Sequence, residues 1–334
     1  MTALDIIRNL KIERDRHMSW VSSHFGSMPD GHFGAIAIDN KQCVLAPYPE
    51  FAISLYRGQT KFYEPCVSSL FRSNTNKIDR FISYLRIAEF QLLLSSHPAV
   101  VDFAKWKIMD LSIRIDYEGL AQHYGLKTQL VDLTSDPYVA AFFACCEYDT
   151  TLNQYKPVLK ANHKGVIYKF SFALNSLVED QNSSPSRSSV VGLQPLDRPA
   201  EQYAYCYRLT KKQSLNSMPY FKPYFFTHDP KISIKVFERF EGGKTLFPSD
   251  PVKEKAIAIS KTMKISAEAL HLVMAKFKKK FKEKKTINDL KRKGIIIVEK
   301  SQISFTEKEK LIIQGQWNLR REDILSKIGV RRCF

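Results

Sequence analysis

The 334-residue sequence lacks the features that would indicate a disulfide framework, a zinc site or a membrane anchor. Its six cysteines are scattered, and none belongs to a Cys-x-x-Cys pair. Apolar stretches such as 138–146 fall short of the roughly 18 residues that cross a bilayer, and residues 1–10 lack the layout of a signal peptide. These absences predict reduced thiols, no bound metal, no membrane contact and a cytoplasmic location.

Acidic residues are also scarce, because 34 Asp and Glu stand against 51 Lys and Arg, a formal net charge of +17. Eleven of the cations lie between 276 and 300, together with only three acids. Clustered cations favour phosphates, since binding releases counterions. We therefore predict nucleic-acid contacts from this segment, and the alternative is a solvated basic helix face. The lysines concerned are Lys276, Lys278, Lys279, Lys280, Lys282, Lys284 and Lys285.

Hydrophobic periodicity predicts helices and short strands mixed along the chain, as in an α+β fold. Helical spacing covers 3–22, 78–95, 99–115, 138–148 and 252–263, whereas 51–56, 130–133 and 165–172 have the pattern of short strands. We expect a helical N-terminal arm with a strand (1–45), a central domain (46–262) and a basic helical C-terminal region (263–334).

The C-terminal region has the pattern of two helices, 267–285 and 287–293, followed by two short β-like runs. Residues 295–298 and 302–305 are expected to pair as a hairpin. Helix, helix and hairpin in this order are compatible with a winged helix.

Two segments place polar groups at the ends of apolar runs. Arg57 ends the first predicted strand, and His123 lies at the end of a short predicted helix that Gly125 terminates. Asp132 and Thr134 belong to the second strand. Side chains at strand ends are often functional, so these residues are candidates for one site.

The two segments resemble the FRG domain family over about residues 50–146. The first carries Tyr56-Arg57-Gly58-Gln59, followed by Leu70-Phe71-Arg72. The second carries Gln122-His123-Tyr124-Gly125, then 128–134 and 140–144, which are similar to the family's Thr-Arg-Leu-Leu-Asp-Trp-Thr strand and Ala-x-x-Phe-Ala helix. Gln129 and Leu133 stand where the family has Arg and Trp, and Arg198 and Gln202 match part of a later segment.

The layout is also similar, more loosely, to that of the mono-ADP-ribosyltransferases. This likeness implies small mixed or antiparallel sheets surrounded by helices, and NAD as a substrate. Arg57 would hold the pyrophosphate, and hydroxyl and aromatic groups would order the nicotinamide end. The residues expected at the catalytic centre are Arg57, His123, Thr134, Asp132 and Glu201. Those expected at the NAD-binding surface are Arg57, Tyr56, Gln59, Tyr124 and Ser135.

The essential acid is left open between Glu201 and Asp132, because Asp132 can equally organise its loop by hydrogen bonds. The competing interpretation of Arg57 is that it forms a structural ion pair with Asp132 or Glu89. The leading hypothesis is a transferase that modifies a nucleic acid or ribonucleoprotein, in the manner of a toxin or antiphage effector. The alternative is a non-catalytic nucleic-acid-binding module that uses Arg57, Arg72 and the Lys-rich C-terminal region, and a third reading is a sensor that binds a nucleotide without consuming it.

Overall fold

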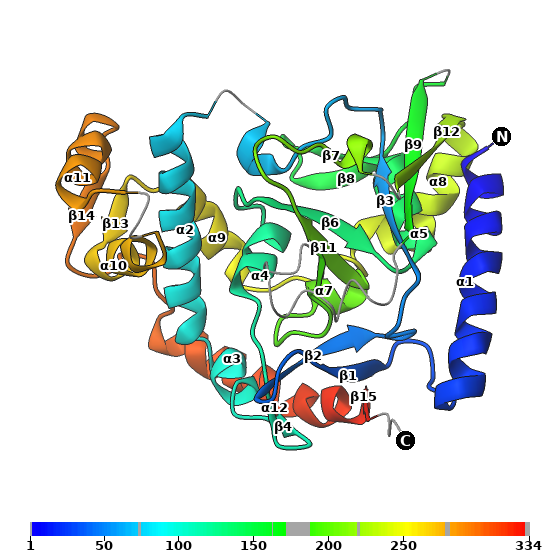
Figure 1. Cartoon of the computed structure of the whole chain (residues 1–334), viewed down its shortest axis with the longest axis horizontal. Coiled ribbons are helices and arrows are strands. Elements are labelled where there is room, and N and C mark those ends of the chain that lie inside the picture. The colour runs from blue at the N-terminus through cyan, green and yellow to red at the C-terminus, as the bar shows by residue number, and fades with distance from the viewer. Residues whose placement is uncertain are drawn as a thin grey trace.

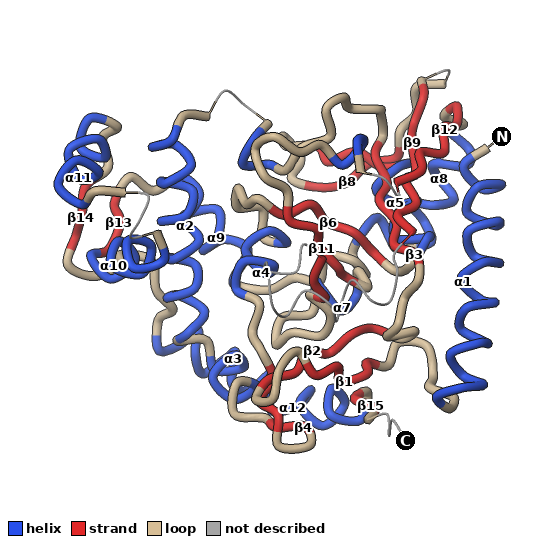
Figure 2. The backbone as a smooth tube through the Cα atoms, viewed as in Figure 1, coloured by secondary structure: helices blue, strands red, loops and turns tan. Residues whose placement is uncertain are grey.

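A computed structural model of the chain confirms the α+β class, with small sheets enclosed by helices (Figures 1 and 2). It describes residues 2–72, 75–161, 163–171, 188–218, 221–277 and 281–330. None of the helices in these ranges is both long and apolar enough to cross a membrane. The likeness to mono-ADP-ribosyltransferases stays a prediction.

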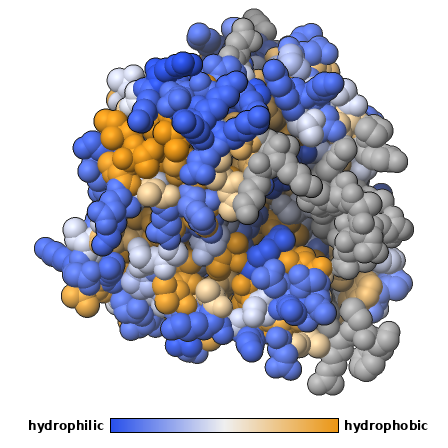
Figure 3. Space-filling model, turned by 60° about the vertical axis from the view of Figure 1, so that its left-hand side comes forward, coloured by the Kyte–Doolittle hydropathy of each residue, from blue (hydrophilic) through white to orange (hydrophobic). Residues whose placement is uncertain are grey.

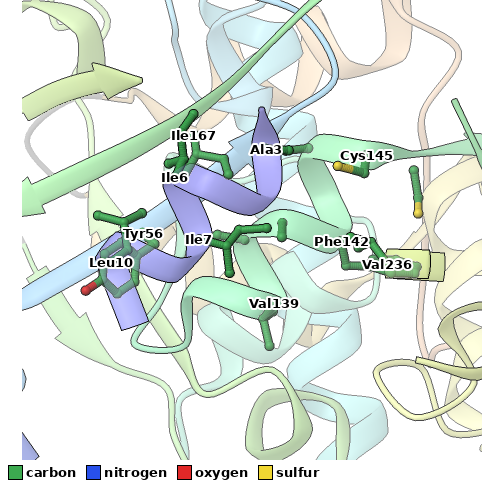
Figure 4. Close-up of a cluster of buried hydrophobic side chains, with 14 of the residues drawn as sticks. Ala3, Ile6, Ile7, Leu10, Tyr56, Val139, Phe142, Cys145, Ile167 and Val236 are labelled. Atoms are coloured by element: carbon green, nitrogen blue, oxygen red, sulfur yellow. The ribbon is translucent and has the colours of Figure 1, made fainter. Parts of the chain in front are cut away.

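The N-terminal helix α1 (Ala3–Phe25) forms as the sequence predicts. Its first turn is closed by a capping box, in which the Thr2 side chain accepts from the Asp5 amide and the Asp5 carboxylate accepts from the Thr2 amide. The apolar stripe of α1 is buried against helix α5 (Pro137–Cys145) and the neighbouring strands (Figure 4). Burial of this stripe fixes α1 along one side of the molecule (Figure 1).

A five-stranded sheet joins the two ends of the described chain in the order β15-β1-β2-β5-β4. The strands are β1 (Phe33–Ala37), β2 (Gln42–Pro47), β4 (Lys107–Ile108), β5 (Leu111–Ile113) and β15 (Ile328–Gly329). Helices α3 (Pro98–Phe103) and α12 (Glu307–Ser326) pack on it around Trp317. The predicted helix 99–115 is therefore wrong beyond Phe103, because Met109 and Asp110 turn the chain with φ of 51° and 66° into a hairpin.

The second sheet has six strands, and all its adjacent pairs are antiparallel. In order across the sheet they are β10 (Ser188–Val190), β11 (Ala204–Arg208), β6 (Leu130–Thr134), β3 (Ser54–Gln59), β9 (Lys164–Ser171) and β12 (Phe221–Thr227). Strand β3 pairs with β9 along its whole length but with β6 at the single pair Tyr56–Thr134. Beyond that pair β3 and β6 part, which leaves a split in the middle of the sheet.

Helix α5 covers this split and contacts β3 closely. It is apolar on all sides, as predicted, but it ends at Cys145, where the chain enters the hairpin of β7 (Cys146–Asp149) and β8 (Gln154–Pro157). A Cβ atom added at Gly58 would lie 1.7 Å from the Ala140 carbonyl oxygen. Only glycine at this position lets α5 approach the strand this closely.

The first part of the C-terminal region, residues 264–298, is a basic helical appendage that packs on helix α2 (Lys77–Ser95), whereas α12 and β15 of the same region belong with the five-stranded sheet. The appendage contains β13 (Lys264–Ser266), α10 (Ala267–Lys276), α11 (Glu283–Arg292) and β14 (Ile296–Val298). The predicted hairpin is wrong, because residues 302–305 form no strand and β14 pairs in parallel with β13. The domain boundaries and the winged-helix interpretation stay predictions.

The remaining elements connect these units. They are the helices α4 (Tyr117–His123), α7 (Arg198–Glu201), α8 (Pro230–Arg239) and α9 (Val252–Lys261), and the short 3-10 turns η1 (Ser69–Phe71), η3 (Leu215–Ser217) and η4 (Glu241–Gly243).

Replacing Gly58 by alanine should destabilise the fold, because the added methyl group meets the backbone of α5. We expect Gly58→Ala to lower the free energy of unfolding by about 2 kcal/mol or more, which urea denaturation measures. Gly315→Ala is the matched control, since Gly315 lies inside α12 with no neighbouring atom within 4 Å of an added Cβ. That change should be neutral or stabilising by up to about 1 kcal/mol. Equal effects of the two substitutions would contradict the close approach of α5.

Candidate active site at the split between two strands

A cavity of about 360 Å³ opens where β3 and β6 part. Its lining comes from β3, η1, α4, β6, α5 and β8, with Arg72 and Gln202 added from the connections. Arg57, His123, Asp132 and Thr134, which are far apart in the sequence, all line it. The two sequence segments with polar ends thus meet at one place.

Arg57 reaches across the split. Its Nη1 donates to the Asp132 carbonyl oxygen at 2.7 Å. If the pairing of β3 with β6 continued beyond Tyr56–Thr134, Asp132 would face Gly58, so the guanidinium takes the place of the missing strand contact. Arg57 forms no ion pair within the described residues, and its buried Nε has no partner there. The predicted alternative of a structural ion pair with Asp132 or Glu89 is therefore wrong.

Arg72 supplies a second guanidinium to the same cavity. Burial, and next the positive charge of Arg57, lower the pKa of the Arg72 side chain. Its Nε donates to the Val67 carbonyl, and no carboxylate pairs with it in the part of the chain that is described. Two neighbouring cations without carboxylate partners form a site that favours an anion.

The Asp132 carboxylate is held by one of its oxygens. Gln122 Nε2 donates to Asp132 Oδ2 at 3.1 Å, and Thr128 Oγ1 in turn donates to Gln122 Oε1 at 2.5 Å. Asp132 Oδ1 is buried and has no hydrogen-bond partner among the described residues. One oxygen of the carboxylate is therefore fixed, and the other is buried without a partner in a residue that lines the cavity.

His123 is held in one tautomer. Gln202 Nε2 donates to the Leu246 carbonyl at 2.9 Å, which orients the amide so that Gln202 Oε1 faces His123 Nδ1 at 3.0 Å. An amide oxygen only accepts, so Nδ1 carries the proton and Nε2 has a free lone pair when the ring is neutral. Nε2 is buried without a partner in the described structure. Burial lowers the pKa of His123, although the negative charge of Asp132 opposes this.

Thr134 joins the end of β6 to the next segments. Its Oγ1 donates to the Gln202 carbonyl at 2.7 Å and accepts from the Asp136 amide at 3.1 Å. Asp136 then caps α5 by accepting from the Tyr138 amide. Thr134 lines the cavity, but its hydroxyl is occupied in positioning Gln202 and the start of α5.

Tyr56 also lines the cavity. Four other predicted residues lie outside its lining, namely Gln59, Tyr124, Ser135 and Glu201. Gln59 is buried near Cys66, and the Tyr124 hydroxyl donates to Asp250. Ser135 is buried at a separate cavity of about 190 Å³ beneath α1.

Glu201, one of the two candidate acids, does not reach the cavity. It ends α7, and Asp197, Lys327 and Arg320 lie near its carboxylate; burial, and next the charge of Asp197, raise its pKa. The geometry therefore favours Asp132.

Sequence reasoning missed two kinds of contributor to the lining. Gln202 was identified only as part of a motif, and its contact with His123 spans 79 positions of the chain. Tyr155 and Phe143 form an aromatic wall with ring centroids 6.3 Å apart, and no motif marks Tyr155.

None of the predicted nucleic-acid lysines that the structure describes belongs to the lining of this cavity. Lys282 and Lys285 line a groove beside α2, while Lys276 ends α10 and Lys284 is exposed on α11. Lys278, Lys279 and Lys280 lie outside the described residues. No group of three or more His, Cys, Asp or Glu side chains suited to a metal occurs in the described ranges.

The His123 ring should titrate below its ordinary pKa of about 6.5, so that it is neutral at neutral pH. Removing the nearby negative charge with Asp132→Asn should lower this pKa further, because that charge favours the protonated ring. Histidine resonances followed by NMR across the acidic range measure both values. An unchanged or higher pKa in Asp132→Asn would contradict the proximity of the two groups.

Residues 52–152 match the sequence model of the FRG domain. The matched range includes both segments of the cavity but neither Gln202 nor the basic C-terminal region. No curated protein and no solved structure was found to match the chain.

Proposed function

Because the chain contains an FRG domain whose two sequence blocks enclose one cavity, we propose that this cavity binds NAD and transfers ADP-ribose to a macromolecule. The observation that carries the proposal is that one cavity is lined by two guanidinium groups and by a carboxylate that keeps one oxygen unpartnered in the described structure. The other expected residues are assigned roles from their positions around these groups.

Arg57 and Arg72 suit the diphosphate. A diphosphate linkage carries two negative charges, and the lining offers two cations that repel each other while the cavity is empty of anions. The planar guanidinium donates two parallel hydrogen bonds to phosphate oxygens, which a lysine cannot do. Binding would therefore relieve the repulsion between the two arginines.

Asp132 suits the reacting ribose. When the bond from the ribose carbon to the nicotinamide nitrogen breaks, its electron pair neutralises the pyridinium, and positive charge develops on the ribose. A fixed carboxylate in a site from which water is largely excluded stabilises that charge. The free Oδ1 is the atom assigned to this role.

His123 suits the acceptor. As an acceptor hydroxyl or amine bonds to the ribose carbon, it loses a proton, and the lone pair on His123 Nε2 takes that proton. Gln202 keeps the ring in the required tautomer. The aromatic wall of Tyr155 and Phe143 offers apolar surface to the nicotinamide ring.

The alternative of a non-catalytic module is less well supported for the arginines. Arg57 is half-buried and bonded to the backbone of β6, so it is not placed to follow an extended phosphate backbone on the surface. A sensor that binds NAD without cleaving it would use the same arginines but would have no need of Asp132. Modification of a nucleic acid or a translation component would suit a toxin or an antiphage effector.

Asp132→Asn tests the chemical step. We expect nicotinamide release from NAD, in the presence of cell extract as the acceptor source, to fall by about 100-fold or more in kcat. Asp110→Asn is the matched control, because Asp110 is an exposed turn residue with a φ of 66° that asparagine tolerates. Wild-type protein that releases no nicotinamide, or an Asp132→Asn variant as active as the control, would refute the proposal.

Arg57→Lys tests the diphosphate role separately. It keeps the charge but loses the fork geometry, so kcat/KM for NAD should fall by roughly 10-fold or more. Arg16→Lys is the matched control, because Arg16 is an exposed arginine outside the cavity, and it should leave kcat/KM unchanged. A normal kcat/KM in Arg57→Lys would show that the diphosphate is held elsewhere.

A further inference from the structure

A second concave surface lies between the start of α2 and helix α11, in the C-terminal appendage that Figure 3 brings forward. Its volume is about 780 Å³. Hydrophilic side chains cover much of this side of the molecule and surround smaller hydrophobic areas (Figure 3). The groove belongs to neither of the cavities that contain the predicted site residues.

Cations dominate the lining of this groove. Five of its residues are basic and one, Asp289, is acidic, a formal charge of +4. The basic residues are Lys77, Lys282, Lys285, Arg292 and Lys293. Four of them belong to the Lys-rich segment, and the fifth, Lys77, lies about 200 positions earlier in the sequence, so the fold adds a cation from α2 to those of the segment.

Internal ion pairs neutralise only part of this charge. Arg292 pairs with Asp289 at 3.4 Å, and Lys293 pairs with Asp79 at 2.9 Å. Lys77 lies over the Phe281 ring at 4.5 Å. Lys282 and Lys285 are exposed and have no carboxylate partner in the described ranges. The groove therefore keeps a positive potential at the surface.

The two walls of the groove are fixed to each other. Phe81 and Leu85 of α2 share a buried cluster with Leu290 of α11. Arg86 Nη2 donates to the Thr262 carbonyl at 3.1 Å, and the buried Glu89 carboxylate accepts from the Ser266 amide at the start of α10. A site whose walls are held in place loses little conformational freedom on binding.

We propose that this groove binds the sugar–phosphate backbone of a nucleic-acid strand. Four of its five cations are lysines, which act as point charges and accept phosphates in many geometries, whereas carboxylate recognition favours paired contacts to arginine. The apolar residues of the lining are engaged within the protein, because Phe281 packs on Phe81 with ring centroids 4.4 Å apart and Ile78 joins the same cluster.

The groove is close to the cavity at the β3–β6 split. Arg72 lines the cavity and Asn76 lines the groove, and the four residue steps between them span at most about 14 Å. That length corresponds to about four stacked nucleotides at about 3.4 Å each. A strand that extends about four nucleotides beyond the groove would therefore reach the cavity, and this proximity favours nucleic acid as the acceptor. This last assignment rests on the proposed function, whereas the binding itself does not.

Binding is tested without NAD, by the fluorescence anisotropy of a labelled single-stranded oligonucleotide of roughly 20 nucleotides titrated from about 50 to 300 mM salt. The triple variant Lys77→Gln, Lys282→Gln, Lys285→Gln should lose about 50-fold in affinity near 0.15 M salt, and the salt slope should fall by about 2. The control triple variant Lys41→Gln, Lys107→Gln, Lys160→Gln removes the same charge from exposed lysines outside the groove. It should bind nearly as the wild type does.

Asp289→Asn should change the affinity in the opposite direction, and a misfolded protein would not show such a gain. It removes the only carboxylate in the lining and releases Arg292, so affinity should rise by several-fold. Equal losses in the two triple variants, or an unchanged affinity in Asp289→Asn, would overturn the proposal. Displacement of the oligonucleotide by polyglutamate at equal charge concentration would do so as well, because it would assign the groove to acidic peptides.

The acceptor assignment is tested with labelled NAD and the same oligonucleotide. Transfer of label to the strand that is lost in the groove triple variant, while nicotinamide release continues, supports it. Oligonucleotide binding without any nicotinamide release would refute the proposed function, whereas the proposal that the groove binds nucleic acid would stand. If nicotinamide is released and the groove variant transfers label as well as the wild type does, the acceptor is not nucleic acid held in the groove.

Discussion

The parting of β3 from β6 is the constraint on which the rest of the site depends. The strands remain paired at Tyr56–Thr134 and then separate. Helix α5 approaches β3 so closely at Gly58 that no larger residue fits, and Arg57 donates to the Asp132 carbonyl that the missing strand contact leaves exposed. Each residue of the Tyr-Arg-Gly tripeptide thus has a structural role: Tyr56 pairs with Thr134, Arg57 bonds to the Asp132 carbonyl, and Gly58 lets α5 approach. Arg57 is also the residue to which we assign the diphosphate.

The cavity at this split combines charges that the fold leaves unbalanced. Two arginines lie together with no ion-pair partner in the described chain, while a carboxylate and an imidazole each keep one unpartnered buried atom. Leaving such groups without partners is costly, and their concentration in one place supports the binding site proposed above. The groove between α2 and α11 also holds unbalanced charge, because its lining contains five basic residues and one acid.

The sequence predicted the local features of the fold and of the site, and it failed where distant segments decide the outcome. Arg57, His123 and Asp132 were identifiable because each lies in or at the end of a short predicted strand or helix that carries a motif. Gln202 and Tyr155 were not, because only tertiary packing brings them to the cavity. The hairpin expected after 295 was wrong because β14 instead pairs with β13, about 30 residues earlier in the chain. Charge count found the Lys-rich segment, but it could not show that Lys77 lies opposite.

The most direct test of the account is a crystal structure of the Asp132→Asn protein with NAD, since this variant should bind the dinucleotide but cleave it slowly. The account predicts the diphosphate between Arg57 and Arg72, with the reacting ribose carbon facing the side chain at position 132. NAD bound outside the β3–β6 split, or its diphosphate held away from both arginines, would contradict it.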